Sequence, residues 1–184
     1  MKIQFLRIFT FAFVLISLVS CSSDDNNNTN TETSFIRAQI GDVTWESSET
    51  ITSSVIQVGQ LGKRFDLTAQ NDDIRITLAS EQTTVGGECM NLVSYSGDNI
   101  LTILWYAVGD GTYAGLYDET PWLGDPSEQN FVITITSCEN GLISGTFSGT
   151  QFISGGSNSN YPDTVEITNG EFQNVPYTFT LIED

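Results

Sequence analysis

Histidine is absent from this chain of 184 residues. Its absence excludes Ser-His-Asp and Cys-His catalysis, and it removes the side chain that most often ligates zinc, copper and iron. A glycoside hydrolase that works with two carboxylates needs no histidine. A chain with 23 acidic residues, however, meets the spacing of such a pair by chance. No catalytic residue is therefore assigned, and the chain is predicted not to be an enzyme.

Basic residues are scarce as well. The chain has 6 Lys and Arg against 23 Asp and Glu, which gives a formal net charge of -17. Beyond the first seven residues the basic side chains are Arg37, Lys63, Arg64 and Arg75. Because phosphate binding depends on clustered Lys and Arg, the composition predicts no nucleic-acid partner.

A long apolar run occurs at the N-terminus, where residues 8–19 are broken only by Thr10 and Ser17. Two cations, Lys2 and Arg7, precede it. The run is shorter than the roughly 20 residues that a helix needs to span a bilayer. A charged start followed by a short apolar stretch is typical of a secretory signal peptide, which we predict over residues 1–20.

The signal ends in Leu18-Val19-Ser20-Cys21, which resembles the lipobox of bacterial lipoproteins. The resemblance implies that the Cys21 thiol is acylated, that the peptide is cut before Cys21, and that the lipid attaches the chain to the membrane. The next residues, Ser22-Ser23-Asp24-Asp25, resemble the acidic export tag of surface-exposed lipoproteins of the Bacteroidota. Together these resemblances imply lipid anchoring in the outer membrane with display at the cell surface, although inward-facing attachment fits the same residues.

The segment that follows is polar throughout. Residues 24–34 read DDNNNTNTETS and hold no large apolar side chain, so they bury too little surface to offset the entropy of ordering. We predict a lipidated, disordered tether over residues 21–34. The remaining length suits one domain with its own core, predicted over residues 35–184.

Cysteine occurs three times. If Cys21 carries lipid, Cys89 and Cys138 remain. An even pair in an exported protein predicts a disulfide, and two separate buried thiols are the alternative. A catalytic thiol has no histidine to activate it.

The domain shows the alternation of apolar and polar residues that is typical of strands, without helical periodicity. Ile74, Ile76 and Leu78, for example, share one face of a strand, whereas residues 99–108 form a continuous apolar run and predict a strand buried on both faces. Short strands with no helices between them favour antiparallel pairing, because parallel crossovers need a dozen or more residues. We predict an all-β domain, an antiparallel two-sheet sandwich, with a closed barrel as the alternative. The expected strands cover residues 35–40, 41–45, 52–58, 63–69, 73–79, 99–108, 112–117, 130–136, 141–152, 163–172 and 176–182.

Both ends of the domain carry a second resemblance. The C-terminal ISGTFSGT (143–150) and VEITNGEFQNVPY (165–177), and the N-terminal FIRAQIGDVTWES (35–47), resemble a family of Bacteroidota lipoproteins of unknown function. The middle of the chain, particularly residues 80–129, matches loosely. The resemblance implies a β-rich fold and transfers no activity and no site residue.

The loop over residues 116–128 is the main candidate site. It holds the acidic residues Asp118, Glu119, Asp125 and Glu128, and oxygen-rich loops of this kind bind Ca²⁺, although the spacing matches no EF-hand. The aromatic side chains of Tyr113, Tyr117 and Trp122 are candidates for stacking on sugar rings. We therefore expect a binding or structural module, with a Ca²⁺-assisted carbohydrate-binding module as the alternative; a solvated acidic loop is the plainer interpretation. The ligand, whether glycan or protein, does not follow from these residues.

Overall fold

The computed structural model describes residues 33–49, 51–109, 112–120, 128–154 and 161–183. They belong to one compact unit, Glu32–Asp184. Within these ranges no helix is long and apolar enough to span a bilayer. The elements are β1 (Phe35–Ile40), β2 (Val43–Glu46), β3 (Thr52–Val58), β4 (Gly62–Gln70), β5 (Ile74–Gln82), β6 (Ser94–Ser96), η1 (Gly97–Asn99), β7 (Ile100–Gly109), β8 (Thr112–Asp118), β9 (Val132–Glu139), β10 (Leu142–Ile153), β11 (Thr164–Pro176) and β12 (Thr178–Ile182).

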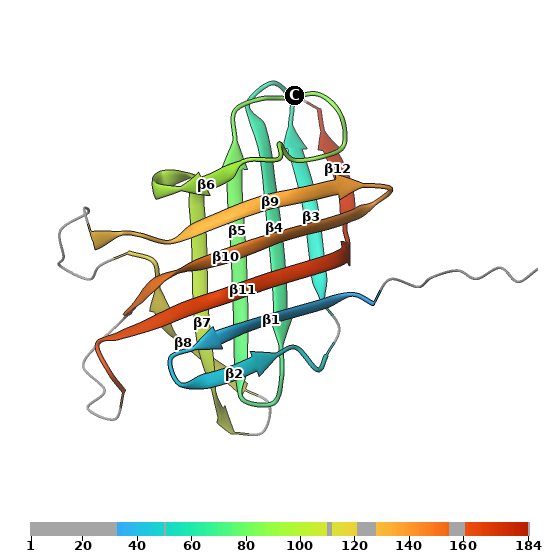
Figure 1. Cartoon of the computed structure of the whole chain (residues 1–184). Coiled ribbons are helices and arrows are strands. Elements are labelled where there is room, and N and C mark those ends of the chain that lie inside the picture. Colours follow the sequence, from blue (N-terminus) through green and yellow to red (C-terminus); the bar gives the residue numbers. More distant parts are fainter. Residues whose placement is uncertain (1–32, 50, 110–111, 121–127, 155–160, 184) are drawn as a thin grey trace, which may run out of the picture. The chain divides into compact units, whose positions relative to one another are not determined.

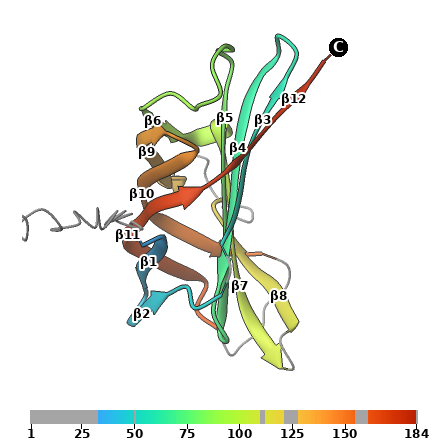
Figure 2. The same cartoon turned by 90° about the vertical axis from the view of Figure 1, so that its right-hand side faces the viewer.

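The strands form one open sheet that folds over into two layers. Hydrogen-bonded neighbours follow the order β12-β3-β4-β5-β7-β8-β10-β11-β1-β2, with β9 beside β10 and β6 beside β9. The turn between layers lies where the ends of β8 and β10 pair. Figure 1 shows the front layer, with β9, β10, β11 and β1, crossing steeply over the back layer of β3, β4, β5 and β7. Figure 2 shows the two layers edge-on. The predicted all-β sandwich is confirmed, and the sheet does not close into the alternative barrel.

One strand pair departs from the predicted antiparallel pattern. β12 runs parallel to β3, with Thr178 opposite Ser54 and Ile182 opposite Val58. The cause is the short passage at Pro176 and Tyr177, where the chain leaves β11 in the front layer and enters β12 at the edge of the back layer (Figure 2). A strand that arrives this way runs in the direction of β3, and no crossover helix is needed.

The core lies between the layers and follows the period-two pattern. Phe65 and Leu67 of β4 and Leu78 of β5 point inward and are buried. The Phe65 ring stacks on Phe172 of β11, with 5.8 Å between ring centres, so the contact joins the two layers. Burial of such side chains contributes about 1.5–3 kcal/mol each, which makes this interface the main source of stability.

Strand β7 is not buried on both faces, so this prediction from the sequence is wrong. The apolar run over residues 99–108 predicts burial on both faces, but Leu101 is 38% exposed, whereas Thr102 is buried. The front layer covers only the inner face of β7, so the outward residues of this strand meet solvent.

Gly145 of β10 allows Thr134 of β9 and Phe172 of β11 to approach the backbone of β10 closely. A Cβ atom at Gly145 would overlap the Thr134 carbonyl oxygen and the Phe172 ring. Gly115 of β8 is different, because its nearest neighbour, the Trp105 ring, would lie at an ordinary 3.8 Å. An added Cβ therefore requires its neighbours to shift at Gly145 and meets only ordinary contacts at Gly115.

Candidate functional site

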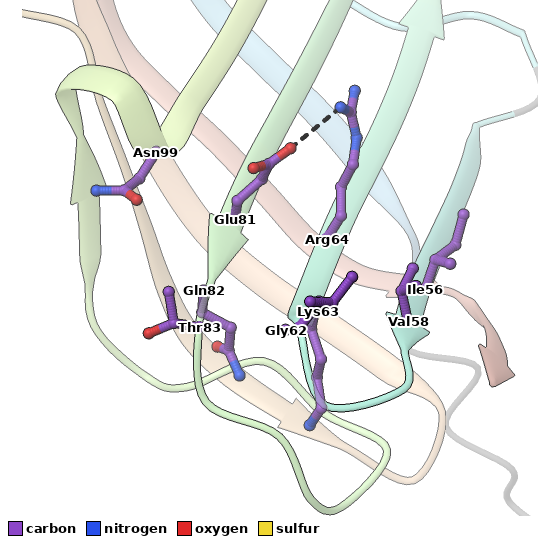
Figure 3. A pocket seen from close by; sticks show the side chains of 10 residues that line it. Ile56, Val58, Gly62, Lys63, Arg64, Glu81, Gln82, Thr83 and Asn99 are labelled. Atoms are coloured by element: carbon purple, nitrogen blue, oxygen red, sulfur yellow. Dashed lines mark hydrogen bonds and ion pairs between the residues drawn. The ribbon is translucent and has the colours of Figure 1, made fainter. Parts of the chain in front are cut away.

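A groove lies on the outer face of the back layer, which is the face turned away from the front layer. It encloses about 310 Å³, near the lower end of the usual range for ligand pockets. Figure 3 shows it at the ends of β3, β4 and β5. We call it the outer-face groove; its lining is Ile56, Val58, Leu61, Gly62, Lys63, Arg64, Glu81, Gln82, Thr83 and Asn99.

One side of the outer-face groove is apolar and the other carries an ion pair. Ile56 and Val58 project from β3, and Leu61 in the following turn is 75% exposed. Across the groove, Arg64 Nη1 lies 3.3 Å from Glu81 Oε1, the pair marked in Figure 3. Because both partners are exposed, the pair contributes less than about 1 kcal/mol and a ligand can replace it at little cost. The groove thus suits a small group with an apolar part and a polar part.

Lys63 lies beneath the groove and holds a loop. Its side chain points inward and is 3% exposed, and Nζ donates hydrogen bonds of 2.6 Å to the carbonyl oxygens of Gly86 and Cys89. Burial lowers the pKa of Lys63. Cys89 and Cys138 form a disulfide, as predicted, with 5.9 Å between their Cα atoms, a usual separation. Residues 83–93 are therefore fixed both to β4 and to β9.

Aromatic residues of the predicted loop site do not form a surface platform in the described part of the chain. Tyr117 is fully buried, and its hydroxyl donates to the Pro162 carbonyl oxygen at 2.8 Å. Burial, followed by the nearby tyrosines Tyr106 and Tyr161, raises its pKa to about 12. Trp122 lies outside the described residues, as does the side chain of Tyr113.

The acidic residues of the loop are separated. Asp118 pairs with Ile103 on the outer face, and its carboxylate accepts a hydrogen bond of 2.8 Å from the backbone of Thr120. Burial raises the pKa of Asp118. Glu119 is buried on the inner side, whereas Glu128 is exposed. Asp125 lies outside the described residues. Within the described ranges no three acidic, Cys or His side chains gather as a metal site; Ca²⁺ binding stays a prediction.

Comparisons with protein-family models, with curated proteins and with solved structures give no match to this chain. Its function is therefore argued from its own residues.

A second hollow on the outer face is polar. It is lined by Ser48, Glu49, Thr52, Thr68, Gln70 and Arg75. Arg75 Nε donates to Gln70 Oε1 at 2.8 Å, and the Arg75 guanidinium lies 5.4 Å from the centre of the Trp105 ring. The guanidinium therefore lies over one face of the Trp105 indole, which is partly buried.

A buried polar cluster that was not expected from the sequence comprises Thr102, Glu119 and Gln151, each at most 4% exposed. Glu119 Oε2 accepts hydrogen bonds from the backbone of Thr102 at 2.6 Å and from its hydroxyl at 3.2 Å. Gln151 Nε2 donates to the same hydroxyl. Burial raises the pKa of Glu119, and the bonds from Thr102 oppose this. One signal could have revealed the cluster: the period-two register places Thr102 on the same face as Ile100 and Leu104.

Proposed function

We propose that this chain is a lipoprotein of the outer membrane, anchored through Cys21 and displayed at the cell surface, whose β-domain acts as a binding module. The anchoring rests on Leu18-Val19-Ser20-Cys21 at the end of an apolar run. Acyl chains contribute about 0.8 kcal/mol for each buried CH₂, so two or more give stable attachment. The acidic residues after Cys21 support display, since they are repelled by anionic lipid.

The binding role rests on the outer-face groove. Its apolar side accepts a hydrophobic group, and the exposed pair of Arg64 and Glu81 offers both a donor and an acceptor. A glycan or a peptide can supply such a mixed surface.

Anchoring is tested by the mass of the protein recovered from cells. The expected species begins at Cys21 and carries added acyl mass. A Cys21→Ser variant should keep residues 1–20 and lack the lipid, whereas the neighbouring Ser22→Ala variant should behave as the natural chain does. Recovery of the natural chain with its first twenty residues and no acyl mass would refute the anchoring.

Display and binding need separate tests. Protease added to intact cells should remove the domain; protection until the outer membrane is opened would place the domain on the inner side. For binding, the full-length chain in detergent is applied to glycan and peptide arrays together with Val58→Lys and Val43→Lys variants. Signals that use the groove should be lost with Val58→Lys and kept with Val43→Lys, since Val43 is exposed on β2, away from the groove. An absence of any such signal would reject the groove as the binding site.

A further inference from the structure

Strand β12 is an open edge of the sheet. It pairs with β3 on one side and ends the order of strands, and no described strand pairs with its other side. Its backbone N–H and C=O groups on that side are therefore available to a further strand. In Figure 1, β12 lies at one lateral edge of the back layer.

The edge lacks the features that usually prevent strand addition. Natural edges are protected by Lys, Pro or a bulge. β12 reads TFTLI and its neighbour β3 reads TSSVIQV, so neither holds a charge or a proline. Their pairing runs from Thr178 to Ile182 without a register shift. Leu181 and Ile182 are 50% and 49% exposed. This uncharged, apolar edge belongs to a chain with 23 acidic residues.

Acidic residues lie at both ends of β12. Glu183 directly follows the strand and is exposed. Glu88 lies in the loop whose Gly86 N donates to Gln57 Oε1, and Gln57 pairs with Leu181, so this acidic residue belongs to the same end of β12 as Glu183. At the other end, Glu139 lies near the start of β12, because it pairs with Leu142, which in turn pairs with Pro176.

The acidic residues at the ends of β12 distinguish between two partners for this edge, a second copy of the chain and a segment of another protein. A second copy pairing antiparallel with β12 would bring its Glu183 to the end where Glu139 lies, and the like charges would repel. The described basic side chains do not offset this: Arg37 pairs with Glu171, Arg64 with Asp66 and Glu81, Lys63 binds loop carbonyls, and Arg75 binds Gln70. A segment of another protein with basic ends meets opposite charge at both ends of the edge.

We propose that β12 binds an extended segment of another polypeptide by strand addition, and that this segment is apolar in its middle and carries Lys or Arg at its ends. Main-chain hydrogen bonds supply affinity, and Leu181 and Ile182 contact alternate side chains of the segment. The acidic ends select the basic partner. This inference goes beyond the proposed function, because it uses the unpaired edge of β12 and not the outer-face groove, and it does not depend on how the chain is anchored.

The test uses full-length chain in detergent and a labelled peptide in which isoleucine and valine alternate between paired lysines. Fluorescence anisotropy should show saturable binding that weakens with added salt. A peptide with glutamates in place of lysines should bind at least tenfold more weakly. A third peptide, N-methylated at alternate residues along one edge, should not bind, since it lacks the required N–H donors.

Two variants complete the test, and each replaces one acidic residue with lysine, so that both change the net charge by the same amount. Glu183→Lys should weaken binding about threefold to tenfold, the range expected when one surface charge is reversed. Asp42→Lys, in the exposed turn between β1 and β2, should leave binding unchanged. Equal binding of the three peptides, equal loss in the two variants, or a dimer of the chain that the peptide does not dissociate would overturn the proposal. Because lipidation plays no part in the assay, a negative result here leaves the anchoring unaffected.

Discussion

Two substitutions of Glu119 distinguish how its hydrogen bonds and its buried charge each affect the stability of the domain. It is 4% exposed and accepts two hydrogen bonds from Thr102. In Glu119→Ala the Thr102 backbone N–H loses its acceptor in the interior, which costs about 1–3 kcal/mol, and the removed side-chain atoms leave a small cavity. We expect a total loss of about 2–4 kcal/mol. Glu119→Gln keeps an acceptor oxygen, so its free energy of unfolding should stay within about 1 kcal/mol of the natural chain.

Urea unfolding at neutral pH measures both variants. With a slope of about 2 kcal/mol per molar, Glu119→Ala should lower the midpoint by about 1–2 M. Equal midpoints for the Ala and Gln variants would refute the role given to the hydrogen bonds.

The pH dependence of the same variants tests the charge. Because burial raises the folded-state pKa of Glu119 above 4.5, the folded protein favours the protonated form. This group therefore lowers stability as pH rises from about 4.5 to the folded-state pKa, and no further above it. Glu119→Gln lacks this titration and should gain stability relative to the natural chain over that window. A difference that does not change with pH would show that Glu119 titrates as in the unfolded chain.

Three further changes have defined outcomes. Gly145→Ala should lower the free energy of unfolding by about 1–3 kcal/mol through overpacking, whereas Gly115→Ala should change it little; equal effects in urea unfolding would contradict the close approach described. Reduction of the disulfide between Cys89 and Cys138, 49 residues apart, should lower stability by about 4 kcal/mol in the loop-entropy model, measured by urea unfolding with and without reductant. Lys63→Met removes two hydrogen bonds to loop carbonyls and should speed hydrogen exchange over residues 83–93, with unchanged exchange as the contrary result.

Much of the strand pattern follows from local sequence. The runs over residues 35–40 and 52–58 match β1 and β3, since alternation reports directly which side chains face the core. The pairing partner of a strand depends on distant residues, so the parallel arrangement of β12 and β3 could not be predicted from local sequence. The three-residue strand β6 is too short to show alternation.

The candidate site was less accessible to prediction. The groove gathers residues of β3, β4 and β5 that are ordinary strand residues one by one, and only the sheet brings them together. Glu119 falls in a polar stretch that was expected to be a loop, and Tyr117, at the end of the strand expected over residues 112–117, was expected to be available to a ligand. Their burial depends on distant residues: Ile153 of β10 pairs with Tyr117, whose hydroxyl donates to the Pro162 carbonyl oxygen, and Gln151 of β10 donates to Thr102, which binds Glu119.

The pairing of early strands with late ones sets the order in which the domain can assemble. β1 pairs with β11, and β3 pairs with β12, the last strand of the chain. Contacts over such separations slow folding, because closure of the long intervening loops must come first. During synthesis, both N-terminal strands keep an unmatched side until the final residues emerge. A chain that ends before β11 therefore leaves one side of β1 and one side of β3 unpaired, although β2 and β4 still pair with their other sides.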